Sequence, residues 1–314
     1  MKQFNTAGDI VKLAAMECAA SCIMTALTIA GHDYRYFLLS YWNLNYNSKI
    51  IMSGKNMRHN DLQFAYGIAK ECRSGTEDDL IALLRQNNMA MLFCKASKLR
   101  FFPRNMLGHE SSGFQHFILL YGYQPETGKF LVIDPVADYK GEISAYEVWD
   151  CSVKSSEIIY YSLELPDYYE QPSASRIFSK ESSANLRNYS GDKAIAAFIQ
   201  DLQACLQWPQ DERDTWINQN NITISSIVKT RSIVWECFCD LNLMTPDEIR
   251  AGNEIVEQIV SLWTTVNFLL IKLKKNHSNE AIAKSIEQKL ETLKVKELEC
   301  LQFIQQKGLE LYAV

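Results

Sequence analysis

Three residues of this chain, a cysteine, a histidine and an aspartate in that order, are suited to acyl-transfer chemistry. Cys18 lies at the start of an apolar segment, His116 begins a second one, and Asp134 ends a third. In such a set the thiolate attacks an acyl carbon, the imidazole moves the proton, and the carboxylate orients the imidazole. The residue types and their order therefore predict a Cys18–His116–Asp134 triad.

The position of Cys18 favours reactivity. The apolar pattern predicts a helix that starts at about Glu17 and ends at Gly31. Position 18 then lies at the helix N-terminus, where partial positive charge favours a thiolate and free N–H groups can stabilise an oxyanion. Cys22 lies one turn further on and is expected to be a packed thiol. A helical cysteine alone is more often structural, so the case for Cys18 depends on the other two residues.

His116 and Asp134 are predicted to face each other across a β-hairpin. Residues 116–123 and 129–133 are the clearest strands in the sequence. If the loop covers residues 123–127, His116 and Asp134 lie directly opposite, with Cβ atoms about 5 Å apart. A tight turn at 127–128 would instead separate the pair, but Pro125 favours the longer loop.

The other histidines are weaker candidates. His32 follows a predicted helix C-terminus, where a cation is favoured in any case. His59 and His109 lie in polar loops without a placed carboxylate, and His277 lies in a predicted break between helices. His116 is therefore the histidine that we expect to act with Cys18.

Composition excludes several classes of function. The chain has 314 residues, is 47% hydrophobic and 22% charged, and carries a net charge of -5. This is the composition of a soluble globular protein, and it leaves no excess of Lys and Arg to bind nucleic acid. The apolar run 13–31 contains Glu17 and ends in a helix-cap pattern, so we expect a buried helix and no membrane span.

The cysteines indicate a reducing compartment. Nine cysteines are scattered along the chain, no pair of CxxC motifs is present, and the N-terminus lacks a signal-peptide pattern. We therefore expect free thiols in a cytoplasmic protein, with no structural zinc and no cofactor.

Two domains are expected. Residues 1–165 read as an α+β catalytic domain with helices packed on a mainly antiparallel sheet. Residues 166–190 are rich in Pro, Ser, Tyr and Asn and read as a linker, and residues 191–314 read as a helical domain. Within the first domain we expect further helices at 34–44, 61–70 and 76–84, and further strands at 89–95 and 158–165.

Three motifs carry a family resemblance. The stretch from Glu17-Cys18 to Gly31, the strand His116-Phe-Ile-Leu-Leu-Tyr-Gly-Tyr and the strand Phe-Leu-Val-Ile-Asp134-Pro135 resemble motifs of papain-like bacteriocin-processing peptidases. They are still more similar to those of butirosin-type acyltransferases, which include the amide synthetase type of closthioamide biosynthesis. The helical second half, with Gly191, Asp201-Leu202 and Trp208, is similar to the C-terminal domain of these transferases only.

The resemblance implies a papain-like cysteine protease fold with a C-terminal all-helical domain that covers the active site. It also implies an amide synthetase of natural-product (antibiotic) biosynthesis, which moves an acyl group from a carrier-protein thioester through acyl-Cys18 to a small amine or diamine. Two alternatives stay open: a thiol peptidase or thioesterase with the same triad, and a non-catalytic papain-like binding module. The peptidases have a Gln before the Cys where this chain reads Val11-Lys12-Leu13, so Lys12 or Asn5 would have to assist the Cys18 N–H in the oxyanion hole.

A basic loop is a candidate docking site for the carrier protein. Lys95, Lys98, Arg100 and Arg104 surround the segment Phe101-Phe102-Pro103. Carrier proteins are typically acidic, so charge complementarity would favour this loop. The alternative is a solvated loop anchored by buried phenylalanines.

Overall fold

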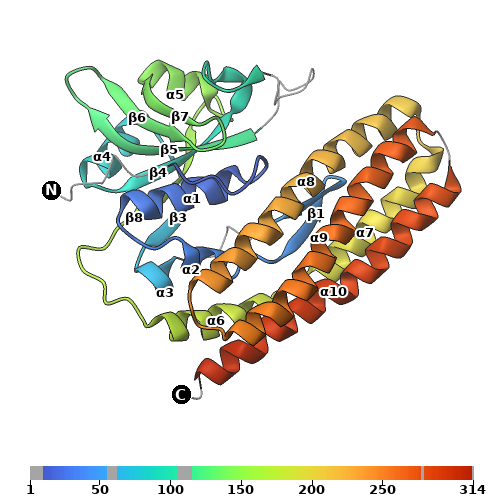
Figure 1. Cartoon of the computed structure of the whole chain (residues 1–314). Helices are drawn as coiled ribbons and strands as arrows, with labels where there is room; N and C mark the ends of the chain where they lie inside the picture. The colour runs from blue at the N-terminus through green and yellow to red at the C-terminus, as the bar shows by residue number, and fades with distance from the viewer. Residues whose placement is uncertain (1–9, 55–61, 105–114, 277–278, 313–314) are drawn as a thin grey trace. The chain divides into compact units, whose positions relative to one another are not determined.

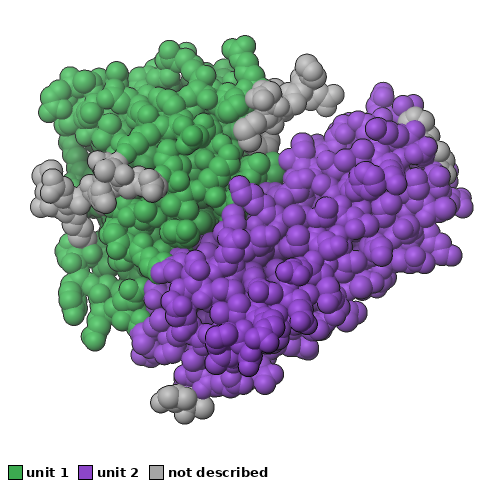
Figure 2. Space-filling model, viewed as in Figure 1, with its two compact units in different colours: residues 1–34, 56–172 green, residues 35–55, 173–314 purple. Residues whose placement is uncertain are grey.

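The computed structural model describes residues 10–54, 62–104, 115–276 and 279–312 (Figure 1). The chain has a mixed α+β fold with a sheet and a C-terminal helical region. It divides into two compact units, shown in different colours in Figure 2. Unit 1 contains residues 1–34 and 56–172, and unit 2 contains residues 35–55 and 173–314.

A six-stranded antiparallel sheet, in the order β3-β8-β4-β5-β6-β7, forms the centre of unit 1. Its strands are β3 (Ala69–Gly75), β4 (Met89–Lys95), β5 (Gln115–Gln124), β6 (Lys129–Asp134), β7 (Tyr139–Ser144) and β8 (Ile158–Glu164). The central strand β4 is apolar along almost its whole length and buried on both faces, whereas the edge strands β3 and β7 carry exposed polar residues. Central strands are covered on both faces and edge strands are not, which explains this difference.

The helices of unit 1 have clear local signals. They are α1 (Cys18–Ile29), α3 (Gln63–Tyr66), α4 (Glu77–Arg85) and α5 (Ala145–Cys151). Capping boxes at Thr76 and Ser144 start α4 and α5. Gly31, with φ of +80°, ends α1, because the left-handed conformation needed there is one that glycine adopts without steric cost. α1 packs on β4, β5 and β6, and α4 packs on β4 and β5.

Unit 2 combines a β-hairpin with long helices. The hairpin is β1 (Leu44–Asn47) and β2 (Ile50–Ser53), and the helices are α2 (Arg35–Leu38), α6 (Ala174–Arg187), α7 (Gly191–Ala204), α8 (Gln210–Asp240), α9 (Pro246–Lys275) and α10 (Glu280–Tyr312). α10 packs against α6, α7 and α9, while α8 packs against α9 and β2. α9 is long and apolar enough to cross a membrane by length and composition alone.

A buried ion pair lies in the core of unit 2. The Nε of Arg231 on α8 donates to both carboxylate oxygens of Glu297 on α10, at 3.0 Å each, and both side chains are 0% exposed. The indole of Trp263 on α9 also donates to Glu297, at 2.8 Å. This cluster therefore links the three longest helices through one carboxylate.

The structure differs from several sequence-based expectations. The helix expected at 34–44 is the short α2 followed by β1, and the helix expected at 61–70 is the short α3 followed by β3. β3 is an edge strand with exposed charged residues, so it lacks the apolar pattern that identifies a strand. β7 and α5 were not expected either.

The division into compact units also differs from the expected boundaries. Residues 35–55 group with the helical unit and not with the sheet. Within the stretch 166–190, expected to be a linker, residues 174–187 form α6, whose N-cap Ser173 accepts a hydrogen bond from the Arg176 N–H. Its Ser-rich sequence has low helix propensity, and packing against α10 supplies the missing stability.

Candidate active site

Cys18 is the first residue of α1. Glu17 is the N-cap residue and makes no side-chain capping bond, so the first turn of α1 presents its backbone N–H groups beside the thiol. The Cys18 side chain is half-buried, whereas Cys22 is fully buried and its thiol donates to the carbonyl of Phe117, at 3.4 Å. Burial, together with the nearby charges of Cys18 and Asp134, raises the pKa of Cys22 well above its ordinary value. The environments of the two thiols therefore differ as the sequence predicts.

His116 and Asp134 lie together in the interior of unit 1. His116 Nε2 and Asp134 Oδ2 are 2.8 Å apart, and the two side chains are 1% and 0% exposed. The other carboxylate oxygen, Oδ1, accepts the backbone N–H groups of Val136 and Ala137, at 2.9 and 3.1 Å. The turn after β6 thus fixes the carboxylate, and the carboxylate fixes the imidazole.

The predicted register of the β5–β6 hairpin was wrong. The loop covers residues 125–128, with Gly128 at φ +65°, and pairs Gln124 with Lys129. A β-bulge between Leu120 and Gly122 then shifts the ladder by one residue. Asp134 consequently lies level with Ile118 and diagonal to His116, not directly opposite it. The two side chains still share a face, because successive residues alternate and positions 116 and 118 point the same way.

The Cys18 thiol lies close enough to the His116 imidazole for its hydrogen bonding and charge to help raise the pKa of the histidine. Because Nε2 is bonded to Asp134, the ring nitrogen available to the thiol is Nδ1. The structure therefore brings the three predicted residues together, with His116 bonded to Asp134 and next to the Cys18 thiol.

The electrostatics of the chain favour a protonated imidazole. Burial of His116 opposes its positive charge, but the hydrogen bonds and negative charges of Asp134 and Cys18 outweigh burial and raise the pKa of His116 to about 9. Near pH 7 the imidazole is therefore mainly charged. An imidazolium beside a cysteine is the arrangement in which the thiolate is the reactive form.

An aromatic side chain packs against the histidine. Phe102, which is 3% exposed, contacts the His116 ring edge-on, with ring centroids 4.7 Å apart. Its neighbour Phe101 stacks on Tyr139 of β7, with centroids 3.9 Å apart. The alternative expected for this loop, anchoring by a buried phenylalanine, is confirmed for Phe102, whereas its contact with His116 was not predicted because no short-range pattern links the two residues.

Lys12, suggested as an oxyanion donor, contacts a backbone carbonyl in the structure. Its ammonium donates to the carbonyl of Val136, at 2.8 Å, and so ties the segment before α1 to the turn that holds Asp134. Asn5, the other residue suggested for the oxyanion hole, lies outside the described residues. Among the described residues, the candidates for the oxyanion hole are therefore the backbone N–H groups at the start of α1.

The basic loop carries less free charge than the sequence indicates. Lys98 pairs with Asp150, at 3.1 Å, and Arg100 pairs with Glu147, at 2.6 Å, both on α5. The site for an acidic partner therefore stays a prediction that rests mainly on Lys95 and the exposed Arg104.

Of the remaining histidines, the structure describes only His32. His32 contacts the ring of Tyr66, with centroids 5.5 Å apart. His59, His109 and His277 lie outside the described residues. Among the residues that the structure describes, no group of three or more His, Cys, Asp or Glu side chains is placed to hold a metal ion.

Comparison with known proteins does not assign the chain to a family. No protein-family model matches it, and no curated protein sequence matches it. The functional interpretation therefore depends on the site itself and on the motif resemblance described above.

Proposed function

We propose that this protein is a cysteine-dependent acyltransferase with a papain-like catalytic domain, and that it forms an amide through acyl-Cys18. The single observation that carries the proposal is the buried His116–Asp134 hydrogen bond with the half-buried Cys18 thiol next to the imidazole. A papain-like domain is supported by a cysteine at the start of a helix that packs on an antiparallel sheet, with the histidine and the carboxylate on neighbouring strands.

The proposed first half-reaction uses the charged imidazole as an acid. The Cys18 thiolate attacks the carbonyl carbon of a thioester, and backbone N–H groups at the start of α1 stabilise the oxyanion of the tetrahedral intermediate. The carbon–sulfur bond to the carrier thiol then breaks, and protonated His116 gives its proton to the departing thiolate. The products are acyl-Cys18, neutral His116 and the free carrier thiol.

The proposed second half-reaction uses the neutral imidazole as a base. An amine attacks the acyl-Cys18 carbonyl, and His116 takes a proton from the amine nitrogen. The carbon–sulfur bond breaks, so the amide leaves and the Cys18 thiolate and His116 imidazolium are restored. Asp134 keeps the ring in the orientation that directs Nδ1 toward the sulfur throughout.

Water competes with the amine as acceptor, and the same triad would then act as a thiol peptidase or thioesterase. The motif resemblance and its helical second half favour the amine. Shielding of the site from water by unit 2 would add to this preference, and such shielding stays a prediction. In the third alternative, a non-catalytic binding module, Cys18 forms no acyl intermediate.

The proposed setting is the cytoplasm, with an acidic acyl carrier protein as donor and a small amine or diamine as acceptor in natural-product assembly. All nine cysteines are free thiols, which supports a reducing compartment. Lys95 and Arg104 are the cations of the proposed docking loop that are not engaged by α5.

Product analysis separates these functions. The full chain is incubated with a short-chain acyl thioester of N-acetylcysteamine and with 1,3-diaminopropane, and the amide and free acid are quantified by mass spectrometry. We expect the amide to exceed the acid and both to vanish in Cys18→Ala. Free acid alone would establish a hydrolase and overturn amide formation, and no turnover by either route would favour the binding module.

A further inference from the structure

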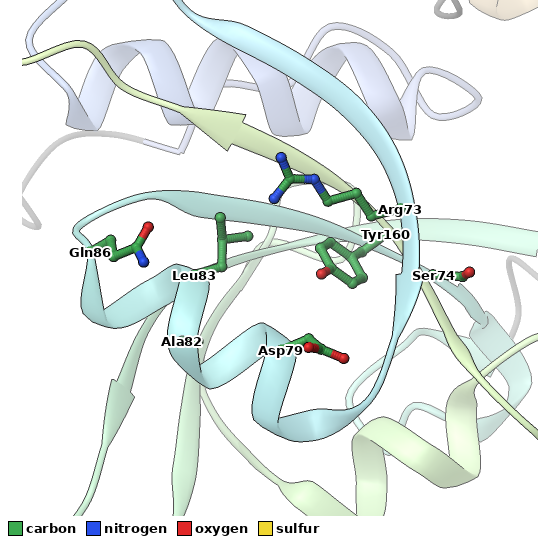
Figure 3. A pocket seen from close by; sticks show the side chains of 7 residues that line it. All are labelled: Arg73, Ser74, Asp79, Ala82, Leu83, Gln86 and Tyr160. Atoms are coloured by element: carbon green, nitrogen blue, oxygen red, sulfur yellow. The ribbon is translucent and has the colours of Figure 1, made fainter.

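An open hollow of about 420 Å³ lies on unit 1 between α4 and the strands β3 and β8, and Figure 3 shows its lining side chains. Its two charged groups are engaged within the fold. Arg73 pairs with Glu164, and the Asp79 carboxylate accepts hydrogen bonds from the N–H and the hydroxyl of Thr76. The surface of unit 2 differs from this hollow, because one of its helices presents large apolar side chains to solvent.

The outward face of α10 carries a stripe of apolar residues. Four large apolar side chains of this helix, between 40% and 77% exposed, are Val295, Leu298, Leu309 and Tyr312. With Gln302 and Gln305 between them, they follow the alternating spacing of three and four residues that is typical of a coiled-coil seam. We call these six residues the α10 stripe.

The α10 stripe lies opposite the face by which the helix packs in unit 2. The packed face is buried and includes Leu290, Leu293, Leu301, Ile304 and Gly308. It contacts α6, α7 and α9, which can be followed in Figure 1. Single exposed apolar residues are normal on a protein surface, but four on one helix face at coiled-coil spacing indicate a surface for packing against another helix.

A second copy of this chain fits the α10 stripe. When a twofold axis runs parallel to the helix, two copies of the stripe meet residue by residue. Apolar side chains then contact apolar side chains at both ends, and the amides of Gln302 and Gln305 meet their own copies in the middle. An amide carries both donors and an acceptor, so such pairs can hydrogen-bond to each other. The stripe is therefore complementary to itself.

The charges beside the stripe favour this parallel pairing. Lys294 and Glu299 lie on opposite flanks of the stripe and five residues apart, the spacing at which flanking residues of two parallel helices meet. Lys294 would face Glu299 of the partner subunit, and the twofold axis would repeat this ion pair. An antiparallel pair would instead place Glu299 beside the neutral Gln306. Within one chain, Lys294 and Glu299 already form ion pairs with Glu291 and Lys296, which hold them at the two flanks.

The size of the stripe predicts a weak dimer. Helix pairing over six seam positions buries on the order of 1,000 Å² in total, which is at the lower limit for specific interfaces. The cost of association then leaves only a modest net affinity. We propose that the α10 stripe binds a second copy of this chain and forms a reversible parallel dimer. This inference does not rest on the proposed acyl transfer.

Analytical ultracentrifugation of the full chain between about 1 and about 300 μM tests the inference, since interfaces of this size dissociate in that range. We expect the average mass to rise with concentration from that of one chain toward that of two. Leu298→Lys sets like charges against each other across the twofold axis and should weaken the dimer about tenfold or more. Lysine has a high helix propensity, so the unfolding temperature of this exposed-site variant should stay close to that of the wild type.

Two further variants make the result specific. Phe268→Lys introduces the same charge at an exposed apolar residue of α9 and should dimerise as the wild type does. Lys294→Glu should weaken the dimer about threefold, and the double variant Lys294→Glu, Glu299→Lys should regain the loss.

A chain that stays monomeric over the whole range, or a Leu298→Lys dimer as tight as the wild type, would overturn the inference and leave the stripe to a partner of another kind. Absence of recovery in the double variant would overturn the parallel arrangement. These outcomes are read from mass alone, so they are distinct from the outcome of the acyl-transfer assay.

Discussion

His116 and Asp134 share a 2.8 Å hydrogen bond although their backbones lie two positions out of direct register across β5 and β6. The bulge between Leu120 and Gly122 makes this possible. If the pairing of Gln124 with Lys129 continued along both strands without a bulge, Asp134 would lie level with Leu119. The Leu119 side chain points to the opposite face of the sheet from His116. The one-residue shift at the bulge returns the carboxylate to the face of the imidazole.

Asp134→Asn tests how far that hydrogen bond controls the histidine. The Asn oxygen can still accept the N–H groups of Val136 and Ala137, so its amide N–H₂ would face Nε2 and force the proton onto Nδ1. This tautomer cannot accept a proton from Cys18 or from the amine. We expect acylation to fall by about two to four orders of magnitude and the pKa of His116 to fall, measured by imidazole NMR titration. An unchanged acylation rate would remove Asp134 from the mechanism.

The stability of the protein should depend on the charge of His116. Its pKa is raised from 6.5 to about 9 in the folded state, because hydrogen bonds and nearby negative charges outweigh burial. The resulting stabilisation is complete below about pH 6.5 and is lost as the pH rises through about 9, by about 3 kcal/mol in total. Urea unfolding of wild type and His116→Gln between pH 6 and about pH 10 measures it. A stability difference between the two proteins that does not change with pH would contradict the raised pKa.

Much of this site could be predicted from the sequence because its determinants are local. The apolar pattern and the Gly31 cap define α1, and the alternation of β5 and β6 defines which residues share a face. The bulge could not be predicted, since no turn residue or change of pattern marks Tyr121 apart from the Gly122 that follows it. The contact of Phe102 with His116 depends on tertiary packing, and no local sequence pattern indicates it.

The missed elements have a common cause. β3 and β7 lie at the edges of the sheet, so half of their residues are exposed and polar, and α6 gains its stability from packing on α10. In each case tertiary contacts override weak local propensity. The capped helix α4, in contrast, begins where Thr76 predicts.

Cys22→Ala should separate the packed thiol from the reactive one. Cys22 is fully buried and bonded to the Phe117 carbonyl, so its removal leaves a small cavity and should lower the free energy of unfolding by about 1–2 kcal/mol. The rate of acylation should stay at the wild-type value, because the Cys22 thiol is buried and donates to the Phe117 carbonyl. Thermal unfolding and intact-mass kinetics measure the two effects, and loss of acylation in a folded Cys22→Ala protein would contradict the assignment.

The effects of substituting Arg231 and Glu297 on the free energy of unfolding should be strongly coupled. Arg231→Met leaves the Glu297 carboxylate buried without its cation, which should lower the free energy of unfolding of unit 2 by about 3–5 kcal/mol. The double variant Arg231→Met, Glu297→Gln removes both charges and keeps an oxygen acceptor for Trp263, so it should regain much of that loss. Arg250→Met is the matched surface control and should have little effect, because its pair with Asp247 is solvent-exposed. Equal losses in the single and double variants would contradict this coupling.

Peptide mapping after a single addition of acyl thioester, without amine, tests the central claim most directly. The account predicts one acyl group per chain, found on the peptide that contains Cys18 and absent from Cys18→Ala, while Cys22→Ala is still labelled. Addition of 1,3-diaminopropane should then remove the label and release the amide. An acyl group on any other residue, or no covalent intermediate in the folded wild-type protein, would contradict the account.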